Sequence, residues 1–144
     1  MTRKTTEAIA DTALHPAPTK IDRNLARLYW AMRLGMAFLW IWTAFVSWFI
    51  HPQAESMEWL HRLGLTYRTD LVLAGACLLD LLMGIASCAF ASRRIWQCQF
   101  AVVAVYSLAI VVGLPEFLFH PFGPITKNMA VLACLAYLSI VEKR

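Results

Sequence analysis

The sequence predicts an all-α integral membrane protein: a four-transmembrane-helix bundle with a short outer surface helix and a proline-rich loop dipping over the bundle mouth. Of its 144 residues, 60% are hydrophobic and only 15% are charged, whereas a typical soluble domain is roughly 45–50% apolar and about 25% charged. A soluble fold of this length would leave too much apolar surface in water. The composition therefore excludes a soluble enzyme, a disulfide-stapled secreted domain and a disordered regulator.

Four apolar segments are candidates to cross a hydrocarbon core of about 30 Å, which takes about 20 helical residues. These segments are residues 29–50, 71–91, 95–114 and 126–141. Apolar residues surround every side of them, as in membrane spans rather than amphipathic surface helices. The first is too long for a cleaved signal peptide, so we expect it to remain as a signal anchor. The chain then divides into a disordered cytoplasmic tail at 1–27 and a membrane domain at 28–144.

Basic residues are unevenly distributed between the two sides of this predicted bundle. Nine lie on the side of the termini: Arg3, Lys4, Lys20, Arg23, Arg27, Arg93, Arg94, Lys143 and Arg144. Three lie on the other side: Arg62, Arg68 and Lys127. Because cytoplasmic segments carry the excess of Lys and Arg, we expect a multi-pass protein of the bacterial cytoplasmic (inner) membrane with both termini in the cytoplasm. The net charge of +4 then reflects orientation in the lipid bilayer, and no nucleic-acid partner is expected.

The connection at residues 51–69 predicts a short helix on the membrane surface. Ser56 is a candidate N-cap for it, and Gly64 is a stop signal. Three apolar side chains cluster on one face of this helix: Trp59, Leu60 and Leu63. We expect the helix to act as a lid over the bundle. His51 and His61 are too far apart in sequence to indicate a metal site.

The second outer connection, PEFLFHPFGP at residues 115–124, is interrupted by three prolines and a glycine. It cannot be helical throughout, yet its phenylalanines favour burial, so we expect it to dip over the bundle mouth. The segment that follows, 126–141, spans roughly 22 Å, several ångströms less than the membrane core. We therefore expect Lys127 and Asn128, at its start, to lie within the outer leaflet and to face inward beside a pocket.

Asp80 lies near the middle of the second span, where a charged carboxylate costs about 2.5–3.5 kcal/mol. It belongs to a stripe of small residues with a four-residue period: Ala76, Asp80, Gly84 and Cys88. Such stripes mark the face where helices approach closely, so we expect Asp80 to point into the bundle. Arg33 or Lys127 could pair with it, and Arg33 could equally snorkel to the interface. A structural ion pair, a protonated acid and a working proton donor all stay open for Asp80.

The sequence contains no recognisable cofactor motif. It has no Gly-rich phosphate loop, no HExxH and no paired-histidine haem signature, and we predict neither a cofactor nor a metal site. The four cysteines all fall in or next to spans without a CxxC pair: Cys77, Cys88, Cys98 and Cys134. They are typical of small buried hydrophobic residues rather than of a dithiol oxidoreductase.

Two stretches carry a family resemblance. The run PEFLFHPFGP followed by Lys127-Asn128 resembles the signature of the DoxX-like family, and LLDLLMG at residues 78–84 with Arg93-Arg94 resembles its second span and inner turn. The similarity covers roughly residues 25–144 and implies a four-helix membrane bundle. Relatives in the DoxX/DoxD group are linked to thiosulfate:quinone oxidoreduction and thiol oxidation. The resemblance singles out these positions: His120, Pro121, Gly123, Pro124, Lys127, Asn128 and Asp80.

Three functions stay open at this point. Our prediction is a binding or accessory module that holds a lipophilic, quinone-like ligand in an intrabundle pocket near Asp80 and Lys127. The first alternative is a membrane enzyme doing isomerase-type proton transfer on a lipid-soluble substrate, with Asp80 and Lys127 as catalytic residues. The second is a redox accessory subunit that reaches quinone through a redox protein partner. The expected ligand-binding residues are Asp80, Arg33, His120, Phe122, Lys127 and Asn128.

Overall fold

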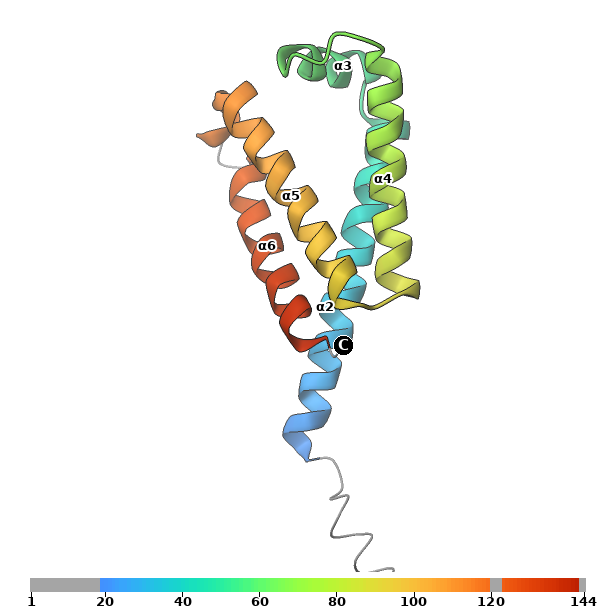
Figure 1. The fold of residues 1–144 in the computed structure, drawn as a ribbon, viewed down its shortest axis with the longest axis vertical. Coiled ribbons are helices and arrows are strands. Elements are labelled where there is room, and N and C mark those ends of the chain that lie inside the picture. The colour runs from blue at the N-terminus through green and yellow to red at the C-terminus, as the bar shows by residue number, and fades with distance from the viewer. Residues whose placement is uncertain (1–18, 120–122, 143–144) are drawn as a thin grey trace, which may run out of the picture. The chain divides into compact units, whose positions relative to one another are not determined.

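The computed structural model describes residues 19–119 and 123–142, and this described part of the chain is helical with short connections (Figure 1). Its elements are α2 (Lys20–Phe45), η1 (Val46–Ile50), α3 (Gln53–Arg62), α4 (Thr69–Ala89), α5 (Arg93–Gly113), η2 (Pro115–Leu118) and α6 (Pro124–Val141). Within it, four helices are long and apolar enough to cross a membrane, namely α2 continued by η1, α4, α5 and α6. The predicted all-α class with four membrane spans is therefore confirmed.

The chain forms two compact units, residues 1–31 and 32–144, whose boundary falls inside α2. In the first unit α2 already begins at Lys20, so residues 20–27 are helical and not part of a disordered tail as predicted. The cause is a reciprocal cap: the Thr19 N–H donates to Asp22 Oδ2 at 2.9 Å, and the Asp22 N–H donates to Thr19 Oγ1 at 3.2 Å. This Thr-x-x-Asp pair satisfies two backbone N–H donors at the helix start, as a capping box does. The rest of the predicted tail, residues 1–18, lies outside the described residues.

In the second unit, α5 and α6 pack side by side, and α4 packs against the part of α2 that begins at Met32. Helices α2 and α4 approach each other tightly at Gly84, where an added β-carbon would stand 2.5 Å from Ile41 Cγ1 and 3.2 Å from the carbonyl oxygen of Ala37. A glycine in the small-residue stripe is thus what lets the two backbones approach. The short turn at Phe90–Ser92 joins α4 to α5, and we call this end of the bundle the Ser92 end.

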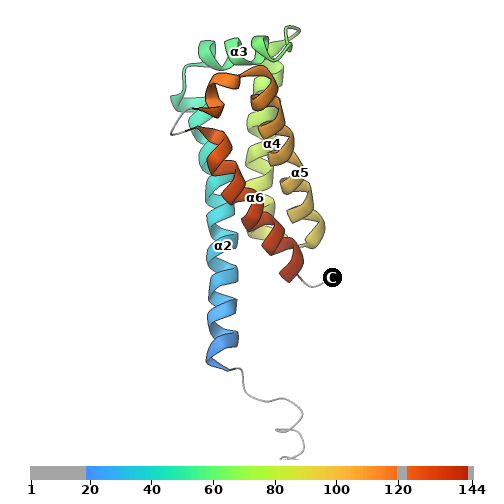
Figure 2. The same ribbon diagram turned by 90° about the vertical axis from the view of Figure 1, so that its left-hand side faces the viewer.

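Helix α3 lies crosswise to the long helices at the opposite end of the second unit, which we call the α3 end (Figures 1 and 2). It begins at Gln53 with Pro52 as N-cap, so the prediction of Ser56 as N-cap is wrong. Proline has no N–H to leave unpaired, and its fixed φ suits the start of a helix. Ser56 lies inside the helix and is buried. The predicted stop at Gly64 is confirmed, because this residue has a φ of 83° just beyond the helix.

Helix α3 contacts the proline-rich segment through side chains of η2. The Trp59 and Phe117 rings meet edge to face with centroids 5.7 Å apart, and Arg62 Nη2 lies 2.6 Å from Glu116 Oε1. The Leu63 side chain also lies against Gly113, the last residue of α5. Aromatic and ionic contacts with η2 and a side-chain contact with α5 therefore hold α3 at this end of the bundle.

The proline-rich segment follows the prediction only in part. Phe117 is half-buried and contacts Trp59, in line with the expected burial, whereas Phe119 is 91% exposed, so that expectation is wrong for it. The next residues, 120–122, lie outside the described residues. Helix α6 begins at Pro124 with Gly123 as N-cap, two residues before the predicted Thr126, because the missing N–H of proline costs nothing at the first helical position.

Candidate functional site

Buried polar side chains lie between the spans in two groups, one toward the Ser92 end and one near the middle of α4 and α5. The first group centres on Gln99 of α5, which is fully buried. Its Oε1 accepts a hydrogen bond from Trp40 Nε1 of α2 at 2.8 Å. Its Nε2 donates to Ser87 Oγ of α4 at 2.9 Å and to the Met83 carbonyl oxygen at 3.2 Å. Both amide N–H groups are used, so this network ties three helices together and offers little to a ligand.

Arg33 belongs to the same half of the bundle. It is only 8% exposed, and its Nε and Nη2 donate to the carbonyl oxygens of Ser87 and Cys88, each at 2.6 Å. These carbonyls lie in the last turn of α4. The last carbonyls of a helix have no intrahelical donors and carry partial negative charge, so they favour a cation. Ser87 is about 10 Å, roughly two turns, along the helix from Asp80. The guanidinium therefore caps α4 rather than reaching the acid.

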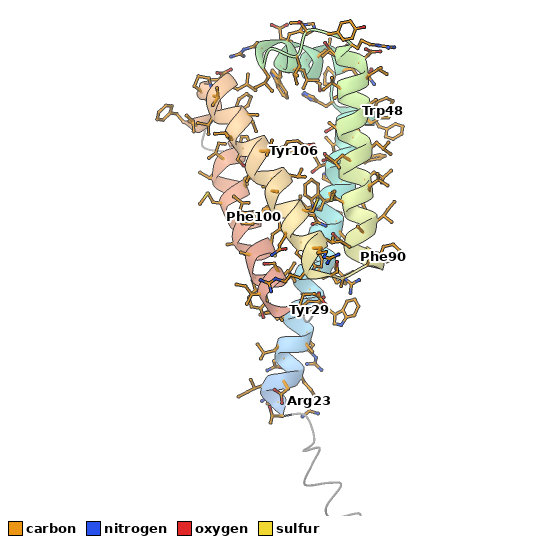
Figure 3. The ribbon with its side chains drawn as sticks, viewed as in Figure 1. Arg23, Tyr29, Trp48, Phe90, Phe100 and Tyr106 are labelled. Carbon is orange, nitrogen blue, oxygen red and sulfur yellow. The ribbon has the colours of Figure 1, made fainter. Side chains whose placement is uncertain are left out.

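Asp80 dominates the second group. It is 5% exposed, so the prediction that the small-residue stripe faces the bundle is confirmed for this residue. Among the described residues its hydrogen-bond partner is Tyr106 of α5, whose Oη donates to Asp80 Oδ1 at 3.5 Å. Figure 3 shows Tyr106 reaching from α5 toward α4. This bond is at the long limit of hydrogen bonding, so the carboxylate retains capacity for another donor.

Of the two residues at the start of the last span, Asn128 is half-buried in the bundle and Lys127 is exposed. Asn128 is half-buried and its Nδ2 donates to Ser107 Oγ at 2.9 Å, one residue along α5 from Tyr106. Lys127 is exposed, so the expectation that both face inward is wrong for the lysine. Consecutive helical residues are about 100° apart, and the long lysine stem can lie along an apolar surface while its charge reaches the interface. The other predicted ligand residues, His120 and Phe122, lie outside the described residues.

An apolar groove runs between α2–η1 and α4, with a volume of about 390 Å³. Its lining residues are Ile41, Ala44, Phe45, Trp48, Phe49, Ala74, Cys77, Leu78 and Leu81. It contains none of the predicted ligand residues. Cys77, which is buried, nevertheless connects it to the acid, because Asp80 follows one turn later on the neighbouring face of α4.

The cysteines differ in environment. Cys77 is buried and Cys134 half-buried, but Cys88 and Cys98 are exposed, so the expectation of buried cysteines is wrong for these two. An uncharged thiol on a span can be solvated by lipid, which removes the need for burial. No cluster of three or more His, Cys, Asp or Glu side chains forms in the part of the chain that the structure describes.

The sequence reasoning missed Tyr106 and Gln99. Both were recognisable as polar residues inside an apolar span. Together with Trp96 and Val103 they recur on one stripe of α5, at a spacing of three, four and three residues. That stripe is the buried face of the helix, because Trp96, Gln99 and Val103 are its buried residues. The spacing of this stripe therefore indicates that Tyr106 lies near the buried face of α5, while its contact with Asp80 is a finding of the tertiary structure.

Comparisons with known proteins place this architecture in a family. A family model described as the DoxX-like family matches residues 37–136, a range that includes Asp80, Tyr106 and Asn128. The comparisons with curated proteins and with solved structures gave no match. The matched range covers more than two thirds of the chain and most of its four apolar helices. On this match, the chain belongs to the DoxX-like family.

Proposed function

We propose that this membrane protein is a binding module for a lipophilic, quinone-like molecule, whose polar group is held between α4 and α5 by Asp80 and Tyr106. The observation that carries the proposal is the contrast between the two buried polar groups. Gln99 is engaged by partners at 2.8, 2.9 and 3.2 Å. Asp80 is 5% exposed, and its hydrogen-bond partner within the described part of the chain is Tyr106, at the long distance of 3.5 Å.

The energetics of the membrane support this interpretation. A carboxylate in the middle of a span costs several kcal/mol, and a purely structural acid would be expected to gain short hydrogen bonds in return. A ligand with a carbonyl or hydroxyl group would supply what is missing. The Tyr106 hydroxyl can donate to a ligand carbonyl, and Asp80 can accept from a ligand hydroxyl or, when protonated, donate.

The apolar groove between α2–η1 and α4 supports the lipophilic character of the ligand. Its volume of about 390 Å³ is within the range of about 300–1,000 Å³ typical of small-molecule sites. Trp48 and Phe45 line it with aromatic surface that suits an isoprenoid or acyl chain. We propose that the tail of the ligand lies in this groove and that its polar group reaches Asp80 past Cys77. Lys127, His120 and Phe122 remain sequence-based predictions as ligand-binding residues.

The test is binding of the reduced quinone analogue decylubiquinol, whose hydroxyl groups can donate to the Asp80 carboxylate. Binding to the purified protein in detergent is measured by the quenching of tryptophan fluorescence. Loss of a hydrogen bond to a charged group costs about 1.5–3 kcal/mol. Asp80→Asn is therefore expected to raise the Kd about tenfold or more, and Tyr106→Phe to raise it by a smaller factor.

Asp70→Asn is the matched control, because Asp70 is on the same helix but exposed in its first turn. This variant should bind with unchanged affinity. Equal affinity of the wild-type protein, Asp80→Asn and Tyr106→Phe for the analogue would overturn the proposal.

The pairing of an acid with a phenol also favours the second candidate, isomerase-type proton transfer on a lipid-soluble substrate. Asp80 and Tyr106 are two groups that can exchange protons with a substrate held between them. Incubation of the protein with extracted lipids in deuterated water would then place deuterium in a lipid. Incorporation should disappear in Asp80→Asn and persist in Asp70→Asn. A redox accessory role would instead show as co-purification of a flavin or haem protein.

We also propose that the protein lies in a bacterial inner membrane with both termini in the cytoplasm. The excess of basic residues around the termini and the Ser92 turn supports this orientation. In a variant without native cysteines, a membrane-impermeant thiol reagent applied to intact spheroplasts should label Arg68→Cys and spare Arg94→Cys. The reverse labelling pattern would show the opposite orientation.

A further inference from the structure

The first described segment of α2, residues 20–31, has a basic face. Four side chains surround a shallow depression of about 260 Å³ on this face: Lys20, Arg23, Asn24 and Arg27. Figure 3 shows Arg23 projecting from this segment. Among the described residues, no ion pair involves any of the three cations, and the acid nearest in sequence, Asp22, is bound to Thr19. The positive charge of this face is therefore available to an external anion.

A second face of the same segment is apolar. Its members are Ile21, Leu25 and Leu28, which are 70%, 50% and 49% exposed. At about 100° per residue, the centres of the basic and apolar faces are about 120° apart around the helix. The segment therefore has the pattern of a basic amphipathic helix, which can place cations in a headgroup layer while its apolar residues enter the acyl boundary.

The length of the first span places this segment outside the hydrocarbon core. Residues 32–50, the remainder of α2 with η1, extend about 28 Å at 1.5 Å per residue, which already nearly fills a core of about 30 Å. Tyr29 and Trp30 precede them, with rings edge to face and centroids 6.1 Å apart. Tyrosine and tryptophan are enriched at the membrane–water interface. Whatever direction residues 20–28 take, they fall in or next to the headgroup layer.

We propose that Lys20, Arg23 and Arg27 form a binding surface for anionic phospholipid headgroups, of the phosphatidylglycerol type. The charge of the surface favours an anionic lipid as its ligand, because three cations over two turns of helix are complementary to the phosphate layer of an anionic leaflet. The adjacent apolar face keeps the segment at the depth of those phosphates. The proposal does not depend on the ligand of the bundle, because these residues are distant in sequence from Asp80 and belong to the other compact unit.

The test is native mass spectrometry of the full chain, released from detergent micelles that contain phosphatidylglycerol or phosphatidylcholine with identical acyl chains. Wild-type protein is expected to retain phosphatidylglycerol preferentially. Each cation near an anionic surface contributes about a fivefold change in affinity. The variant with Lys20→Gln, Arg23→Gln and Arg27→Gln should therefore lose affinity for phosphatidylglycerol on the order of a hundredfold, with phosphatidylcholine unaffected.

Two further variants distinguish loss of the lipid-binding surface from misfolding and from a general loss of positive charge. Arg23→Lys with Arg27→Lys preserves the charge and should preserve the preference even if the triple variant folds poorly. Arg68→Gln removes an exposed cation at the α3 end, on the opposite side of the bundle from the proposed headgroup layer, and should leave the affinity within about twofold. Equal retention of both lipids by the wild-type protein would overturn the proposal. So would an equal loss of phosphatidylglycerol in the triple variant and in Arg68→Gln.

Discussion

Replacement of Gln99 by methionine tests whether the buried polar network holds the bundle together. Methionine keeps a similar length and flexibility but removes both the amide acceptor and the amide donors. Three interhelical hydrogen bonds are lost, one to Trp40 of α2 and two to Ser87 and the Met83 carbonyl of α4. In membrane proteins such bonds are worth about 0.6 kcal/mol on average and up to about 1.7. The three together amount to about 2 kcal/mol of the free energy of unfolding.

The assay is reversible unfolding in mixed micelles of mild detergent and dodecyl sulfate, followed by far-ultraviolet circular dichroism. Gln97→Met is the matched control, because Gln97 is on the same helix two residues earlier and is exposed. This control should change the free energy of unfolding by less than about 0.5 kcal/mol. A double-mutant cycle of Gln99→Met with Trp40→Phe should give a coupling energy of about 0.6 kcal/mol. Equal destabilisation by Gln99→Met and Gln97→Met would refute the reasoning.

Three further predictions concern the packing of α4, the lid and the start of α2. Gly84→Ala should lower the free energy of unfolding by about 1–3 kcal/mol, because the added β-carbon meets Ile41 at 2.5 Å; Gly75→Ala, with no neighbour within 4 Å, should not lower it in the same assay. The Glu116 N–H, and then the Arg62 guanidinium, hold the pKa of Glu116 below its ordinary value of 4.5. The stabilising contribution of the Glu116 carboxylate is therefore present above pH 4.5 and is lost as the pH falls through the lowered pKa. Thermal unfolding between pH 3 and 7 should show this loss in the wild-type protein and not in Glu116→Gln. Thr19→Ala should cost the first turn of α2 about 1 kcal/mol, visible as faster amide exchange in that turn alone.

The membrane helices could be predicted closely, while their ends and partners could not. The burial of Asp80 followed from the small-residue stripe on its own helix. The start of α2 at Lys20 was also present in the sequence, in the Thr19-x-x-Asp22 pair, but the charges around it suggested a solvated tail. Arg33 shows the opposite case. Its long side chain has several possible targets, and its role as a cap for α4 depends on where the end of that helix lies relative to α2.

The sequence by itself determined that this is a four-span membrane protein, because the cost of placing a residue in lipid is local and adds up along each segment. Only the tertiary structure decided which faces of those spans meet. Inside a bilayer, apolar side chains gain little by leaving lipid for protein, so hydropathy does not distinguish a buried face from an exposed one. Close packing at Gly84 and the pairing of buried polar groups make that choice. The same packing brings Tyr106 to Asp80 and leaves Lys127 on the outside.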